Sequence, residues 1–195
     1  MKFADLGDLV VLTLRTPDRA VRLLRGLDLA ASERWMLVIL AASLSSLLAG
    51  IARLIFPVPE GDPLARILSD PMTLAGLQFG AMAVSAIAVT VIGRAFGGKG
   101  VFADALVLVG WVELILVGLQ AVQLFLMLLV PPLANLMSLL AFGLSIYLTI
   151  SLTKALHGFT STPKVALGFI GGVFLVATVL SVIAAAFGVL PEVAP

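Results

Sequence analysis

The chain has 195 residues, of which 61% are hydrophobic and only 12% are charged. This composition excludes a soluble domain, because such a chain could not cover its surface with enough polar residues to face water. The net charge of +1 does not favour a nucleic-acid partner, and the absence of cysteine excludes disulfides, thiol catalysis and metal bound by cysteine.

Residues 1–34 are predicted to form a cytoplasmic segment with one short amphipathic helix. Thr16 suits the N-cap, Pro17 suits the first helical position, and the helix should extend to about Leu27. Its apolar face is Ala20, Leu23, Leu24 and Leu27, and its arginines fall mostly on other sides, which is typical of a helix lying in the membrane interface. The candidate contacts to lipid headgroups are Arg15, Arg19, Arg22 and Arg25. The alternative is an anchor that merely packs beneath the transmembrane helices.

Five long apolar stretches follow, and each can cross about 30 Å of hydrocarbon as a helix. The predicted spans are Trp35–Phe56, Thr73–Ala95, Asp104–Val130, Leu133–Ala155 and Pro163–Gly188. Transmembrane strands would be shorter and would alternate apolar with polar residues. The sequence therefore predicts an all-α membrane bundle over residues 35–190, followed by an external tail at 191–195.

Basic residues are concentrated beside alternate ends of these spans. Ten of the twelve lie before the first span, after the second, or around the turn that follows the fourth. By the positive-inside rule, the N-terminus should lie in the cytoplasm and the C-terminus outside. We therefore expect a multi-pass protein of the cell's inner (plasma) membrane.

Polar side chains in the third and fourth spans form a candidate ligand stripe. Its members are Glu113, Gln120, Gln123, Ser138, Ser145, Thr149 and Lys154. A tight turn at Pro131–Pro132 should make the two spans antiparallel and should place Glu113 about 27 Å from that turn, near the cytoplasmic boundary. Glu113 should then face the level of Thr149 to Ser151, with Lys154 one turn further toward the cytoplasm. Either these groups make hydrogen bonds that fix helix register, or they line a cavity for a lipid headgroup or an ion.

Two turns predicted to be cytoplasmic contain residues that could bind a ligand or take part in catalysis. Residues 93–100 approach a phosphate-binding loop, but Gly100 replaces the hydroxyl residue that would hold magnesium, so a flexible turn with two cations is favoured. His157 is the sole histidine and is predicted to be a cation at a helix C-terminus, since it lacks partners for a metal site or a triad. No metal, cofactor or catalytic residue is predicted.

Three passages, in order along the chain, resemble the Yip domain family of five-span membrane proteins, named for binding Ypt/Rab GTPases. They are the Thr16-Pro17-Asp18 lead, residues 97–106 at the entry to the third span, and residues 155–166 before the fifth. The resemblance implies a cytoplasmic N-terminus, five helices and a role in membrane organisation or partner binding, with no catalytic residues to carry over. The long N-terminal region and the acidic-aromatic motif of eukaryotic members are missing, so the chain is more similar to compact bacterial members.

The leading expectation is a non-enzymatic membrane-organising or partner-binding protein. It would act in the lipid bilayer, with a membrane-protein partner or a second copy of itself as candidate partners and no nucleic acid. One alternative is a small transporter, channel or lipid-handling protein that uses the polar stripe, and another is an accessory subunit of a larger membrane complex. A hydrated cavity joining Glu113, Gln120 and Ser145 would favour transport, whereas a dry bundle would favour scaffolding.

Overall fold

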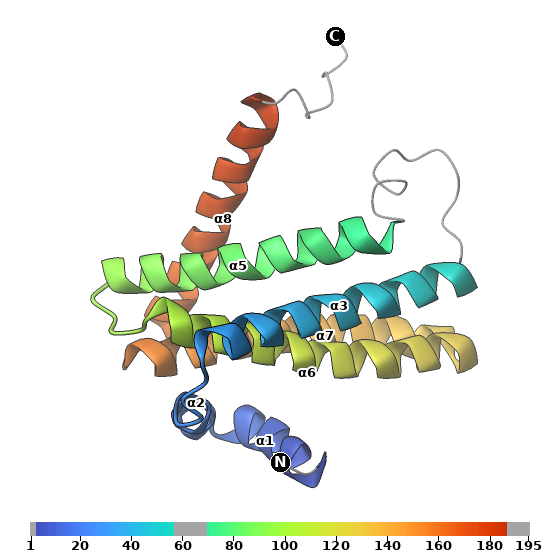
Figure 1. The fold of residues 1–195 in the computed structure, drawn as a ribbon, viewed down its shortest axis with the longest axis horizontal. Coiled ribbons are helices and arrows are strands. Elements are labelled where there is room, and N and C mark those ends of the chain that lie inside the picture. The colour runs from blue at the N-terminus through green and yellow to red at the C-terminus, as the bar shows by residue number, and fades with distance from the viewer. Residues whose placement is uncertain (1–2, 57–69, 187–195) are drawn as a thin grey trace.

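The computed structural model describes residues 3–56 and 70–186, which fold into helices without a strand (Figure 1). The helices are α1 (Phe3–Arg15), α2 (Pro17–Arg25), α3 (Ala31–Ile55), α5 (Pro71–Ala95), α6 (Phe102–Leu129), α7 (Pro131–His157) and α8 (Thr162–Ala186). The predicted all-α class is confirmed.

The five helices α3, α5, α6, α7 and α8 are long and apolar enough to cross a membrane, as predicted. Helix α3 begins before the apolar stretch because the Glu33 carboxylate accepts a hydrogen bond from the Ala30 N–H at 2.7 Å. Helix α7 begins at Pro131, two residues earlier than expected. Proline fits this position because the N–H groups of the first helical turn have no partner within the helix, so the missing N–H of proline costs no hydrogen bond. The predicted end of the fifth span at Gly188, the tail 191–195 and the loop with Glu60, Asp62 and Arg66 lie outside the described residues.

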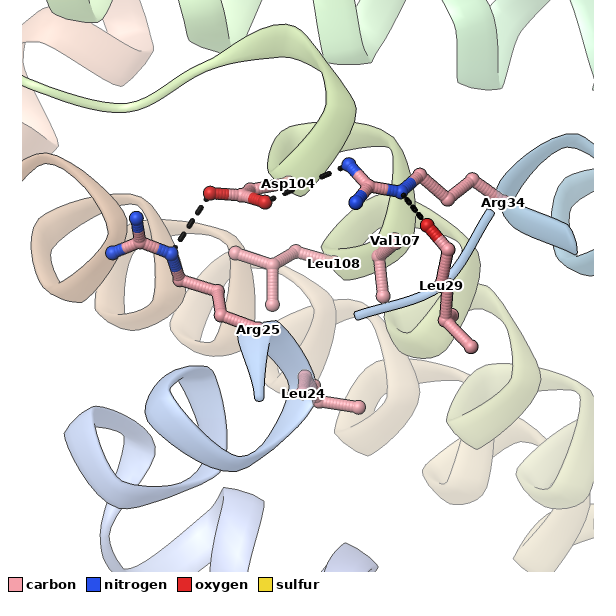
Figure 2. A pocket seen from close by; sticks show the side chains of 7 residues that line it. All are labelled: Leu24, Arg25, Leu29, Arg34, Asp104, Val107 and Leu108. Carbon is pink, nitrogen blue, oxygen red and sulfur yellow. Dashed lines mark hydrogen bonds and ion pairs between the residues drawn. The ribbon is translucent and has the colours of Figure 1, made fainter. Parts of the chain in front are cut away.

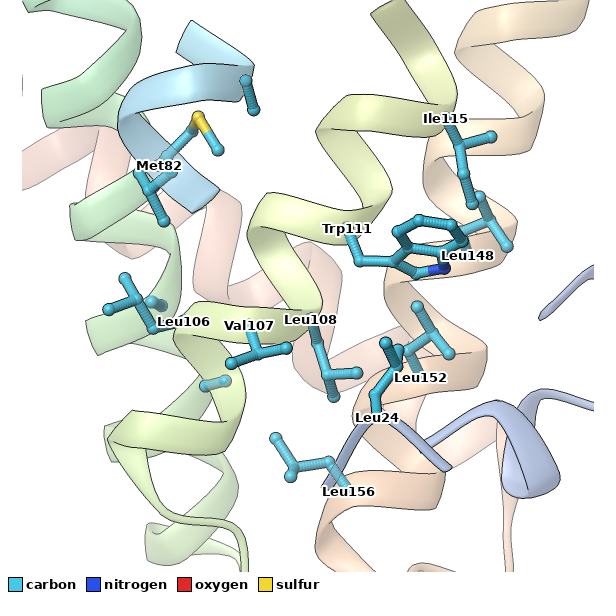
Figure 3. Close-up of a cluster of buried hydrophobic side chains, with 14 of the residues drawn as sticks. Leu24, Met82, Leu106, Val107, Leu108, Trp111, Ile115, Leu148, Leu152 and Leu156 are labelled. Atoms are coloured by element: carbon cyan, nitrogen blue, oxygen red, sulfur yellow. The ribbon is translucent and has the colours of Figure 1, made fainter. Parts of the chain in front are cut away.

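Helix α6 is the centre of the bundle, with α3, α5 and α7 packed against it. Figure 1 shows these four helices running side by side, while α8 leans away from them. Buried Leu108 and Trp111 of α6 point toward Leu148 and Leu152 of α7, whereas Leu106 points toward Met82 of α5 (Figure 3). The core is therefore apolar around α6, and α8 contributes little to it.

Helix α1 was not predicted from the sequence. Its Thr13 is fully buried and accepts a hydrogen bond from the Trp111 indole N–H of α6 at 3.0 Å. The Tyr147 hydroxyl of α7 donates to the Leu14 carbonyl, also at 3.0 Å. Two bonds thus hold the N-terminal helix against the bundle.

Helix α2 begins after Thr16, as predicted, but the Thr16 side chain does not cap it. The hydroxyl instead donates to the Leu12 carbonyl of α1 at 3.2 Å. The buried face of α2 consists of Ala20, Val21 and Leu24. Two residues of the predicted apolar face, Leu23 and Leu27, are exposed, because Val21 takes their place against the bundle.

Candidate functional site

A groove of about 930 Å³ lies between α5, α6, α7 and α8. This volume is near the upper end of the range for small-ligand sites, roughly 300 to 1,000 Å³. The leaning of α8 keeps it apart from the main bundle, so the space between the four helices is not filled by their own side chains. The walls are mainly apolar, with Val112, Leu116, Ile150 and Val173 among the lining residues.

One polar pair stands in the groove wall. The Gln78 side-chain amide of α5 donates to Glu113 Oε1 of α6 at 2.7 Å. Ser145 and Thr149 of α7 also line the groove, but each hydroxyl donates to a carbonyl of its own helix at 2.7 Å. Glu113, Ser145 and Thr149 thus line one groove, but the hydrogen-bond partner of Glu113 comes from α5, an element that the turn geometry at Pro131 did not constrain.

The remaining members of the predicted stripe lie at separate places. Gln123 donates to the Ser138 hydroxyl at 2.6 Å, which joins α6 to α7 at the expected register. Gln120 instead exchanges two hydrogen bonds of 3.3 Å with Ser45 of α3 and does not line the groove. Lys154 donates to the Thr162 hydroxyl at 3.0 Å, so it links α7 to α8 and does not close the stripe at Glu113.

Unpaired cations gather where α5 and α7 end and α6 and α8 begin, which we call the basic end of the bundle. They are Arg94, Lys99, Lys154 and Lys164. None of them forms an ion pair within the described residues. Lys164 lines the groove together with Thr160 and Ser161, so the basic end of the groove presents an ammonium group and two hydroxyls.

His157 closes the basic end as a buried neutral ring and not as the predicted cation. The side chain is 2% exposed, and the Gly100 N–H donates to its Nδ1 at 3.1 Å. Because Nδ1 accepts, the single ring proton is on Nε2, which donates to the Val89 carbonyl at 3.0 Å. Phe159 stacks on the ring, with centroids 5.4 Å apart.

The glycines of residues 93–100 provide the space for this ring. A Cβ atom built on Gly93, Gly98 or Gly100 would collide with His157. The expected flexible turn is therefore wrong: the loop is packed against α7, and its backbone also donates from Lys99 N–H to the His157 carbonyl at 3.3 Å. The glycine-rich spacing reflects close packing and not a phosphate-binding loop.

The arginines of the N-terminal segment divide into two groups. Arg25 contacts Asp104 of α6 at 2.8 Å, and Arg34 lies 3.8 Å from the other oxygen of the same carboxylate (Figure 2). The space beside them is only about 10 Å³, so it could hold about one water molecule and no larger ligand. Arg15, Arg19 and Arg22 are exposed and form no ion pair within the described residues.

The comparisons with known proteins agree with the fold and the helix order. The family model of the Yip1 domain matches residues 11–186, which includes α2 and all five long helices. No curated protein and no solved structure matches the chain. Among the described residues there is also no group of three or more side chains able to hold a metal ion. On the extent of the family match, the chain belongs to the Yip1 domain family.

Proposed function

We propose that this integral membrane protein is non-enzymatic and acts by binding a membrane-embedded partner in the groove between α5, α6, α7 and α8. The observation that supports the proposal is the groove itself, with about 930 Å³ of mainly apolar space in a helical membrane protein. Leaving such a groove open to the bilayer makes it accessible to apolar ligands from the side.

The polar groups support binding more than transport. Glu113 and Ser145 line the groove, but Gln120 is engaged with α3 outside it. The three residues that would mark a hydrated pathway are therefore not joined within the described part of the chain. A ligand held by apolar walls and a few polar contacts fits this arrangement better than an ion.

We propose further that the basic end faces the cytoplasm of a bacterial cell, with the protein in the inner membrane. The support is the excess of Lys and Arg at that end. The chain has no cysteine, so single cysteines can report the orientation. A cysteine replacing Met72, at the opposite end, should react with an impermeant maleimide in intact cells, and one replacing Thr160 should not. The reverse pattern would overturn the orientation.

Groove occupancy can be tested by crosslinking in native membranes. A diazirine amino acid replaces either Val173, which lines the groove and is 53% exposed, or Val179, which is 48% exposed and lies outside it. Val173 should give a discrete adduct, whereas Val179 should give only the background of bulk lipid. Equal adducts at both positions would show that the groove has no specific occupant.

A further inference from the structure

We propose that the occupant of the groove is an anionic phospholipid from the leaflet at the basic end. Its phosphate would contact Lys164, Thr160 and Ser161, and an acyl chain would lie along α8 toward Val173. This inference rests on the proposed function, because it identifies the partner that the groove binds.

Three hydrogen-bond donors at the basic end of the groove have no acceptor among the described residues. The Lys164 ammonium is exposed and forms no ion pair in the described residues. The side-chain hydroxyls of Thr160 and Ser161 likewise make no hydrogen bond within that part of the chain. A phosphate supplies acceptor oxygens and negative charge together, and hydrogen bonds to a charged group are stronger than those between neutral groups. The other unpaired cations of the basic end add to the positive field.

The apolar length of the groove favours a lipid over a soluble phosphate compound. Beyond its basic end, the groove continues between apolar side chains of four helices. Gly168 contributes no side chain there, and a Cβ atom on it would meet only Phe96 at 4.0 Å, which leaves room beside α8. A free phosphate would leave this apolar length empty, whereas an acyl chain can fill it and make dispersion contacts along its walls.

Glu113 does not conflict with this assignment. It lies eleven residues into α6, so about 16 Å from the basic end of that helix. The carboxylate is therefore well separated along the groove from the hydroxyls and ammonium at the α7–α8 turn, and Gln78 donates to it. At an effective dielectric constant of about 20, two unit charges about 16 Å apart repel by about 1 kcal/mol, which a single basic contact offsets.

The experiment measures retention of defined lipids by native mass spectrometry of the purified, delipidated full chain. Phosphatidylglycerol is compared with phosphatidylcholine of the same acyl chains. Two matched pairs of variants test the two halves of the site. Lys164→Gln removes the proposed phosphate contact, and Arg53→Gln removes a cation in the last turn of α3, outside the groove. Gly168→Leu fills the groove, and Gly171→Leu adds the same side chain to α8 outside it.

We expect the unaltered protein to prefer phosphatidylglycerol. Lys164→Gln should weaken binding of that lipid about fivefold, the effect of losing roughly one basic contact, and Arg53→Gln should leave the preference unchanged. Gly168→Leu should reduce retention of both lipids, and Gly171→Leu should not. Circular dichroism and the unfolding midpoint in detergent establish that each variant is folded, and Lys164→Arg should restore binding.

The possible failures are distinguishable. If Gly168→Leu blocks retention but no headgroup preference exists, or Lys164→Gln has no effect, the phospholipid assignment is overturned and groove binding stands. If Val173 crosslinks to a protein and no lipid is retained, the partner is a membrane protein and the lipid assignment is again overturned. If neither lipid retention nor a Val173 adduct depends on the groove, the proposed function falls as well.

Discussion

Replacing Gly93 with alanine tests whether the buried ring of His157 determines the glycine-rich sequence. In an exposed helix, this change would stabilise α5 by up to about 1 kcal/mol, because alanine is the better helix former. At Gly93 the added methyl group would meet the His157 ring, which is 2% exposed and cannot move into solvent. Overpacking of this kind costs about 1–3 kcal/mol, so the net effect should be destabilising.

Gly80→Ala is the matched control, since Gly80 lies in the same helix and a Cβ atom there meets nothing within 4 Å. The assay is unfolding by sodium dodecyl sulfate in mixed micelles, followed by circular dichroism. We expect Gly80→Ala to raise the unfolding free energy slightly and Gly93→Ala to lower it, with a difference of about 1–3 kcal/mol.

A double-mutant cycle with His157→Ala isolates the contact. His157→Ala alone should lower stability, because the Gly100 N–H loses its buried acceptor at a cost of about 1–3 kcal/mol. With the ring gone, Gly93→Ala should become neutral or stabilising, which gives a coupling energy of about 0.5–3 kcal/mol. Equal effects of Gly93→Ala in both backgrounds, or a Gly93→Ala protein as stable as Gly80→Ala, would refute the reasoning.

Three further changes probe other contacts. Thr13→Val should lower stability by about 1–3 kcal/mol and release α1 to protease, because the buried Trp111 N–H loses its acceptor; unchanged proteolysis would contradict this docking. Asp104→Asn should lower the unfolding free energy by about 1–3 kcal/mol, since two arginines lose the charge of a carboxylate whose side chain is only 14% exposed. The Thr73 hydroxyl and then its amide donate to Asp70, which holds the pKa of that carboxyl below its ordinary value. The resulting stability is present above the ordinary Asp pKa of about 3.9 and is lost as the pH falls through the lower folded value. Hydrogen exchange at the start of α5 should therefore quicken in acid, and Asp70→Asn, which caps without titrating, should abolish that dependence.

Sequence patterns predicted the long helices well because each depends on a local property. Twenty or so consecutive apolar residues suffice to identify a span, and the Gln123–Ser138 bond follows from the tight turn that sets the register of α6 and α7. Helix ends shifted by a few residues where Glu33 or Pro131 provided local stabilisation beyond the apolar stretch.

The candidate groove depends on contacts between segments far apart in the sequence. Such contacts could not be predicted from the sequence alone. Gln78 and Glu113 are 35 residues apart on different helices, and no turn fixes their relative depth. His157 was assigned a charge from its position at a helix end, whereas its protonation follows from Gly100 and Val89, which are donor and acceptor from other elements. Residues 9–14 contain five apolar residues, but this stretch is too short to predict a helix beside the much longer spans.

The docking of α1 imposes an order on biogenesis. Thr13 and Trp111 are 98 residues apart, and Leu14 and Tyr147 are 133 residues apart. At a synthesis rate of about 5–20 residues per second, α1 leaves the ribosome before its two partners and waits roughly 5–25 s for them. During that interval its apolar face needs another cover, such as the bilayer surface or a chaperone. Helix α1 is made before the spans that it contacts and reaches its place only after the fourth span has been inserted, so its docking reports that assembly of the bundle is nearly complete.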